Sequence, residues 1–101
     1  MKIKIEYKSI YESINILADT ELNIIICNGE KASISAAMFK EALLDIIFKW
    51  ENELINPDIK DAESYKISII EEDDVFNFVG QGLYPENFIE FKNLLLEVAH
   101  E

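Results

Sequence analysis

The sequence predicts an α+β domain, in which helices pack on a mainly antiparallel sheet of about five strands in the order β-α-ββ-α-ββ-α. Three observations carry this prediction. The first residues alternate between apolar and charged side chains, as a half-buried strand does. Two segments combine apolar runs with turn residues, which is typical of hairpins. Two further segments repeat apolar residues at helical spacing, which is typical of helices packed on a sheet.

The first two elements are predicted to be a strand and a short helix. Every second residue of segment 2–8 is apolar, which indicates a strand with one solvated face. Ser9 and Glu12 have the spacing of a capping box, which begins helices. Apolar residues then recur at helical spacing, so we expect a helix over residues 10–18. The residues with this spacing are Ile10, Ile14 and Leu17.

A hairpin is predicted around Asn28-Gly29. A two-residue loop, the usual one for this dipeptide, would place Ile26 opposite Lys31 and mix apolar with polar side chains on each face. A loop of three residues gathers apolar side chains on one face, so we expect that register, with Gly29 at positive φ. The residues gathered are Leu22, Ile24, Ile26, Ala32 and Ile34. Apolar residues on the reverse side also predict that this strand is central and covered on both faces.

A long helix is predicted next, over residues 36–54, with Ser35 as its cap. Its apolar stripe continues at i, i+3, i+4 spacing to the end of this range. The stripe consists of Phe39, Ala42, Leu43, Ile46, Ile47, Trp50 and Leu54. Asn56-Pro57 ends it and begins a loop that extends to residue 64.

The acidic run 71–74 is predicted to lie at the tip of a second hairpin, residues 65–79. A turn at Glu72-Asp73 sets like residues opposite each other in several successive registers, which favours this pairing. The predicted pairs are Ile69 with Phe76, Ile67 with Phe78, Ile70 with Val75 and Ser68 with Asn77. A last helix is expected over residues 86–99, with Pro85 at its first turn. Its stripe is Phe88, Phe91, Leu94, Leu95 and Val98.

Length and composition predict one cytoplasmic domain, residues 1–101. A chain of 101 residues is near the usual size of a single core. Its longest apolar runs are too short to span a membrane, and the N-terminus lacks the apolar block of a signal peptide. The lone Cys27 excludes an internal disulfide and fits a reducing compartment.

The charge balance restricts the partners that we expect. Twenty acids face nine lysines without any arginine, so the net charge is −11 and the pI is near 4.4. Because nucleic acids and anionic membranes attract cations, we expect this chain to bind neither of them directly. A basic protein is the partner that the charge favours. The alternative is that the acidity only keeps the protein soluble.

Residues that carry chemistry are scarce. His100, the only histidine, is next to last and is expected to fray. Cys27 lies in an apolar strand, where a thiol is unreactive. The four contiguous acids lack the spacing of a calcium loop, and at a wet turn they lack the separated pKa values of a catalytic pair. Gly80 and Gly82 are too few for a phosphate loop and indicate a flexible exit from the hairpin. We expect no catalysis, metal or cofactor.

Two features remain as candidates for a partner-binding site. One is the acidic tip of the second hairpin. The other is an apolar strip on the far side of the long helix, bordered by acids, which either faces a partner or is covered by the loop or the first helix. The candidate residues are Glu71, Glu72, Asp73 and Asp74 at the tip, and Glu41, Leu44, Asp45, Phe48, Glu51 and Ile55 on the helix.

These features together predict a non-catalytic protein-binding domain. The first hypothesis is a small acidic inhibitor of the immunity-protein, antitoxin or phage-inhibitor type, whose carboxylates occupy the basic site of a nuclease toxin or similar protein. The use of lysine without arginine, together with many isoleucines and asparagines, fits an AT-rich bacterial or phage gene. The second hypothesis is a self-associating or adaptor domain that forms a homodimer through the same helix strip.

Overall fold

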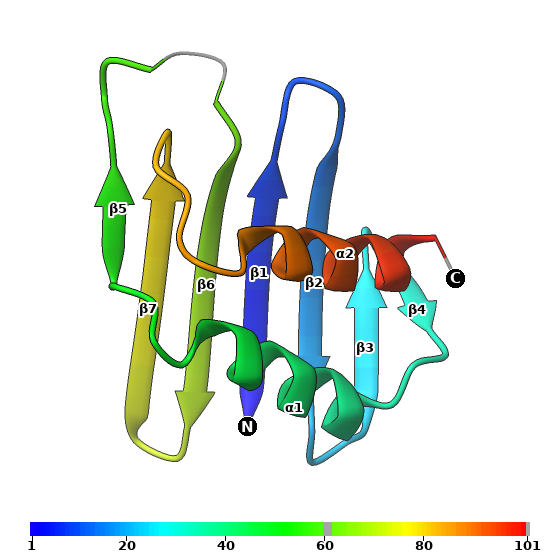
Figure 1. The fold of residues 1–101 in the computed structure, drawn as a ribbon. Helices are drawn as coiled ribbons and strands as arrows, with labels where there is room; N and C mark the ends of the chain where they lie inside the picture. Colours follow the sequence, from blue (N-terminus) through cyan, green and yellow to red (C-terminus); the bar gives the residue numbers. More distant parts are fainter. Residues whose placement is uncertain (60–61, 101) are drawn as a thin grey trace.

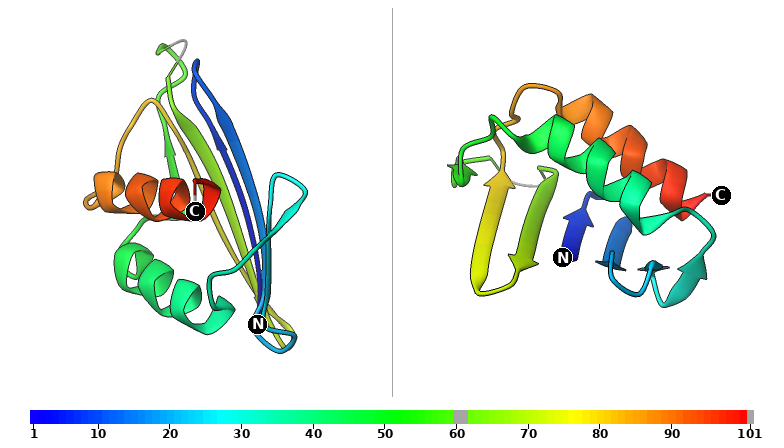
Figure 2. Two further views of the ribbon diagram at one scale, coloured as in Figure 1. Left: turned by 90° about the vertical axis from the view of Figure 1, so that its right-hand side faces the viewer. Right: turned by 90° about the horizontal axis from the view of Figure 1, so that it is seen from below.

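A computed structural model describes residues 1–59 and 62–100, which form a seven-stranded sheet with two helices (Figure 1). The strands lie in the order β4-β3-β2-β1-β6-β7-β5, and all neighbours are antiparallel except β5 and β7. Both helices cover the same face of the sheet (Figure 2). The elements are β1 (Lys2–Lys8), β2 (Ser13–Asp19), β3 (Ile24–Cys27), β4 (Glu30–Ala32), α1 (Ala36–Ile47), β5 (Glu53–Ile55), β6 (Ser64–Glu71), β7 (Asp74–Gln81) and α2 (Phe88–Ala99).

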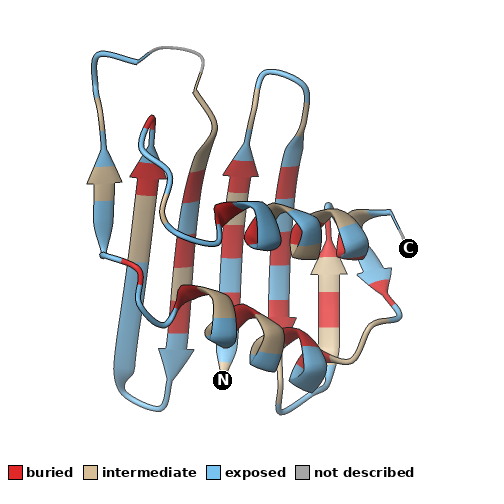
Figure 3. Ribbon diagram, in the orientation of Figure 1, coloured by how far each residue is buried: buried red, intermediate tan, exposed pale blue. Residues whose placement is uncertain are grey.

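The core lies between the sheet and the two helices. Every second residue of β1 and β2 is buried against the helices, and the residues between them lie on the other face. Each helix turns one apolar stripe toward the sheet. The buried helix residues are Ala36, Phe39, Leu43 and Ile47 on α1, and Phe88, Phe91, Leu95 and Val98 on α2. Figure 3 shows burial concentrated on the central strands, whereas the part of β7 nearest the hairpin tip is exposed.

The predicted α+β class is confirmed, but the predicted number and order of elements are wrong. The expected helix over residues 10–18 does not form, because residues 13–19 are β2. Every second residue of β2 is buried, so the apolar period of this segment is two and not 3.6. Ile10 and Leu17, which supplied the helical spacing, are 64% and 50% exposed.

Ser9 and Glu12 interact, but in a hairpin turn and not in a helix cap. The Oγ of Ser9 accepts hydrogen bonds from the backbone N–H groups of Tyr11 and Glu12, both at 3.2 Å. The N–H of Ser9 donates to the carbonyl of Glu12 at 2.8 Å. The strand that follows pairs with β1 along its whole length, from Ser13 opposite Lys8 onward. Pairing with β1 therefore decides the structure after this turn.

The predicted three-residue loop between β3 and β4 is wrong, because Asn28-Gly29 forms a two-residue turn with Cys27 opposite Glu30. The positive φ of Gly29 is confirmed at 84°, and Asn28 also has a positive φ of 50°. The side chain of Asn28 fixes the turn to β2, because its Oδ1 accepts from the N–H of Asn15 at 2.8 Å. The helix side of the sheet receives Ile25, Cys27 and Ala32, and the other side Ile24, Ile26 and Lys31.

This register leaves apolar residues of β3 on the face of the sheet that the helices do not cover. Ile24 and Ile26 lie there only half-buried, so β3 is not covered on both faces as predicted. β3 is also not central, since it is the second strand from one edge. The prediction assumed that the apolar residues of this hairpin all lie on one face of the sheet. In the structure the apolar residues of β3 are divided between the two faces.

The long helix was predicted about seven residues too long. Ser35 caps it as expected, accepting from the N–H of Met38 at 3.4 Å, but α1 ends at Ile47 and residues 53–55 form β5. Trp50 explains the stop. Its indole N–H donates to the carbonyl of Glu86 at 2.7 Å, and its ring packs with Tyr65, Phe88 and Phe91. Trp50 therefore has the sequence spacing of the helical stripe although it lies in the loop after α1. From this loop its ring packs into the core.

The second hairpin is confirmed in each predicted pair, with Glu72-Asp73 as the turn between β6 and β7. The last helix is also confirmed, although it begins two residues later than expected, at Phe88. Part of the predicted loop over residues 56–64 lies outside the described residues, at positions 60–61. Neither described helix has the length and apolar character needed to cross a membrane.

Candidate protein-interaction site

The four acids lie at the exposed end of the second hairpin. Glu71 and Asp74 are the last paired residues of β6 and β7, and Glu72 turns the chain with a positive φ of 54°. All four side chains are exposed. Their position follows from the like-with-like pairing farther up the hairpin, which sets the register and so places residues 72–73 in the turn. The predicted acidic tip is therefore present.

An apolar groove lies beside this tip, between the hairpin and α1. Its volume is about 340 Å³. It is lined by Met1, Leu44, Ile47, Phe48, Ile69, Glu71, Phe76 and Phe78, and is called the tip groove below. Phe48 and Phe76 are 71% and 50% exposed, so the groove presents two aromatic rings to solvent. Three of the predicted site residues thus come together here, namely Leu44, Phe48 and Glu71.

The rest of the predicted helix strip is not continuous. Leu44 is only half-buried in contact with the core, so its own chain covers part of it. Ile55 lies on β5, where it is 41% exposed and opposite Gln81, on the sheet face away from the helices. The predicted grouping of Ile55 with Phe48 is therefore wrong, because the helix ends before either residue.

The predicted acids of the helix are placed around its outer side. Glu41 and Asp45 are exposed on α1. Glu51 follows the helix in the loop to β5 and shares a second, more polar pocket with Phe48 and Lys49. The Nζ of Lys49 lies 5.3 Å from the centroid of the Phe48 ring, so this ring already attracts a cation.

Phe76 and Phe78 were missed as site residues, although their pairing with Ile69 and Ile67 was predicted. The pairing indicates that they share a face with core residues, but it does not indicate how far the helix layer extends along the hairpin. In the structure the hairpin projects past the helices, as Figure 3 shows by its exposed end. Residues on the core face of this projection are therefore accessible.

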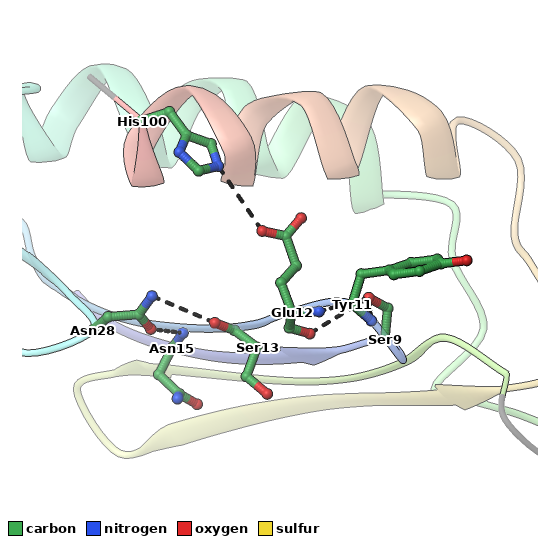
Figure 4. Close-up of polar contacts among 7 residues, drawn as sticks. All are labelled: Ser9, Tyr11, Glu12, Ser13, Asn15, Asn28 and His100. Atoms are coloured by element: carbon green, nitrogen blue, oxygen red, sulfur yellow. Dashed lines mark hydrogen bonds and ion pairs between the residues drawn. The ribbon is translucent and has the colours of Figure 1, made fainter.

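The residues with catalytic potential do not gather at the tip groove. Cys27 is buried in β3. His100 ends α2, where its N–H donates to the carbonyl of Leu96 and its Nε2 lies 3.9 Å from a carboxylate oxygen of Glu12 (Figure 4). This contact ties the end of α2 to the β1–β2 turn. Among residues 1–59 and 62–100, no group of three or more His, Cys, Asp and Glu side chains could hold a metal ion.

The Gly80–Gly82 segment has a structural role. Gly80 is buried in β7 beneath the ring of Tyr65, which a side chain at position 80 would strike. Gly82 has a positive φ of 78° where the chain leaves the strand. The expected flexible exit is therefore a packed strand end, and neither glycine opens a helix that could bind phosphate.

A partly buried polar cluster holds the loop before β6 against α2. The Nζ of Lys92 lies 2.6 Å from a carboxylate oxygen of Glu63. This hydrogen bond raises the pKa of Lys92. Burial, together with the neighbouring Glu63, raises the pKa of Tyr7. Lys92 and Tyr7 thus favour the protonation states that they have at neutral pH, as groups in a structural cluster do.

The sheet face opposite the helices, called the helix-free face below, differs from the rest of the molecule in charge. Its strand residues include five of the lysines and three acids, in a chain whose net charge is −11. An apolar depression of about 440 Å³ lies on it. The lysines are Lys2, Lys4, Lys8, Lys31 and Lys66, the acids are Glu6, Asp19 and Glu53, and the apolar lining includes Leu17, Leu22, Ile24, Ile26 and Ile70.

Comparison of this chain with protein-family models, with curated proteins and with solved structures found no match.

Proposed function

We propose that the protein is a small acidic inhibitor that binds a basic, nucleic-acid-handling protein such as a nuclease toxin, as immunity proteins, antitoxins and phage-encoded inhibitors do. The tip groove is the observation that carries this proposal. It places two exposed aromatic rings, Phe48 and Phe76, beside the four acids of the hairpin tip. Aromatic residues surrounded by charge are the usual centre of a protein interface.

The two parts of this site have different roles in binding. The carboxylates of residues 71–74 stand where phosphates would stand in the partner's own substrate complex, and they accelerate the encounter. The rings of Phe48 and Phe76 provide apolar area that becomes buried on contact, which charge alone does not supply. Such an inhibitor works by occupying a site and requires no catalytic group of its own.

Affinity capture from the native host tests this proposal. The bait is compared with a variant in which residues 71–74 are changed to Gln and Asn. A matched control neutralises four exposed acids away from the tip, namely Glu21, Glu30, Glu90 and Glu97. Both variants lose the same charge, so only the location of the charge differs.

We expect the wild type and the control variant to retain the same basic protein, identified by mass spectrometry, and the tip variant to lose most of it. Adding the wild-type protein should then inhibit the purified partner's action on nucleic acid. A retained protein that is acidic, or equal retention by both variants, would contradict the proposal.

The helix-free face favours self-association as a second candidate function. Leu17 and Leu22 are 50% and 67% exposed at its apolar depression, and a second copy would bury them. If two copies met face to face, lysines of both would surround the contact. Salt would screen this repulsion and strengthen the dimer.

Salt therefore separates the two candidate functions. Sedimentation velocity of the isolated protein at low and moderate salt should show a monomer at both if the inhibitor proposal is right. A dimer that grows with salt, and that Leu17→Ser abolishes, would establish the second candidate. Binding of a basic partner at the tip groove weakens with salt instead.

A further inference from the structure

The edge strand β5 covers only one end of β7. Its three residues pair with Val79, Gly80 and Gln81. One further backbone group of β7 is bonded by a side chain, because the Nδ2 of Asn52 donates to the carbonyl of Asn77 at 2.8 Å. Beyond that point, toward the acidic tip, β7 is bounded by β6 on one side and has no strand on the other among the described residues (Figure 1).

The direction of the backbone groups on this free edge follows from the hydrogen bonds that β7 makes nearer to β5. The N–H of Val79 donates to Asn52, and the carbonyl of Gln81 accepts from Asn56, so odd-numbered residues of β7 point away from β6. Backbone groups alternate in direction along a strand. The N–H and carbonyl of Val75 and the N–H of Asn77 therefore point outward, and within the described chain no strand partner meets them.

The tip groove lies on the helix side of the sheet, over β7, β6 and Met1, and its border nearest the free edge is formed by β7. Phe76 and Phe78 belong to both features, since they are β7 residues that line the groove. A strand added next to β7 would place alternate side chains beside Phe76 on the helix side, and the side chains between them on the opposite face. The edge therefore supplies hydrogen bonds, and the aromatic border of the groove supplies an apolar contact for a side chain on the helix side.

We propose that an extended, basic segment of the partner adds to the sheet as a strand beside residues 74–77 of β7, with an apolar side chain against Phe76 at the border of the tip groove. This inference rests on the proposed function and specifies how the partner is held. Strand addition to an exposed sheet edge, with pockets for alternate side chains, is an established mode of peptide recognition.

Charge determines which occupant this edge accepts. The edge ends at four acids, and residues 75–78 carry no charge of their own. A second copy carries the same four acids and the same net charge of −11, so pairing between two copies is repelled. A segment in which lysine or arginine alternates with apolar residues meets these acids favourably. The same charges thus reject self-pairing and favour a basic strand.

A synthetic peptide tests the inference without an identified partner. The probe is a short capped peptide that alternates lysine with leucine, and its controls are the same peptide with glutamate for lysine and a version methylated at backbone nitrogens. Binding is followed by amide hydrogen exchange measured with NMR. At saturation we expect the N–H groups of Val75 and Asn77 to exchange at least about tenfold more slowly. Those of Phe76 and Phe78 are already bonded to β6 and should change little.

Two substitutions at one position separate the edge from the side chain. Val75→Ala retains the outward N–H and should bind the lysine peptide within about threefold of the wild type, whereas Val75→Pro removes that N–H and should weaken binding about tenfold. Folding of both variants is checked by the protected amides of β1 and β6.

The outcomes distinguish this inference from the proposed function. Binding that methylation does not weaken, or that leaves the exchange of Val75 and Asn77 unchanged, would overturn strand addition, as would no binding at all. Retention of a basic partner in the capture experiment would still support the inhibitor. Equal binding of the glutamate peptide would overturn the charge argument here.

Discussion

The side chain of Tyr65 shows how closely this small core is packed. Its ring lies over Gly80 on the neighbouring strand, in space that any other residue at position 80 would fill. Its hydroxyl is buried and has no hydrogen-bond partner among the described residues. Burial raises the pKa of Tyr65 above the usual value of 10.0, because the phenolate would lose its hydration.

Tyr65→Phe should leave the fold intact and raise the free energy of unfolding by up to about 1 kcal/mol at pH 7, because it removes an unpaired buried hydroxyl. The folded-state pKa lies above the unfolded-state value, so this tyrosine's pH-dependent stability is full below pH 10 and is lost as the pH rises through the folded pKa. The variant should therefore lose less stability than the wild type at alkaline pH. Some loss remains, since the pKa of Tyr7 is also raised.

Urea unfolding at pH 7 and above pH 10, followed by the fluorescence of Trp50, measures both effects. The exposed Tyr11 provides the matched control, because Tyr11→Phe removes the same atom from a side chain that is 90% exposed. Parallel alkaline curves for the wild type and Tyr65→Phe would mean that the hydroxyl of Tyr65 finds a partner in solution.

Among the elements, the second hairpin was predictable and the first helix was not, for one physical reason. In the hairpin, each register sets like residues opposite each other, so local pattern and tertiary pairing agree. In residues 10–18 the sequence allows both a helical and an alternating pattern. The choice depends on β1, which lies beside this segment and pairs with it. Local spacing does not contain that information.

The candidate site was predictable in part for a related reason. The acids of the tip and Phe48 follow from local pattern, but the groove requires the end of α1 to meet the hairpin. The early end of α1 depends on the hydrogen bond from Trp50 to Glu86, thirty-six positions away. Ile55 was wrongly predicted to lie on the helix, because α1 ends at Ile47 and Ile55 belongs to β5.

The two faces of α1 should respond differently to truncation. Phe48→Ala should change the free energy of unfolding by less than about 1 kcal/mol, because the ring is 71% exposed. Leu43→Ala should cost about 2–5 kcal/mol, because Leu43 is fully buried between α1 and the sheet. Urea unfolding gives both values. If the inhibitor proposal holds, Phe48→Ala also weakens partner binding. A loss of several kcal/mol for Phe48→Ala would show that its own chain covers the ring in solution.

At the scale of the whole molecule, charge is unevenly distributed. The strands of the helix-free face carry more lysines than acids, so the excess of negative charge lies on the tip, the loops and the helices. For the basic partner that we propose, attraction is therefore expected on one side of the molecule and not on the other.

Neutralising residues 71–74 to Gln and Asn should slow association with a basic partner and flatten the dependence of the association rate on ionic strength. If the inhibitor proposal holds, dissociation should change less, because the proposed contact buries Phe48 and Phe76. Stopped-flow measurements at low and moderate salt, with the wild type beside this variant, test the expectation. Superimposed salt dependences would show that the tip serves only as a turn.

The central position of β1 has a consequence for biosynthesis. β1 pairs with β2, which follows it at once, and with β6, which begins at Ser64. At roughly 5–20 residues per second, a ribosome takes several seconds to pass from one partner to the other. During that interval one edge of β1 is unpaired. β1 also carries three apolar side chains that are buried in the complete fold. Lys2, Lys4, Glu6 and Lys8 alternate with the apolar residues of this strand, and charged residues on an unpaired strand discourage pairing with other chains. We therefore expect the charged residues of β1 to reduce association of the emerging polypeptide with other chains before its sheet is complete.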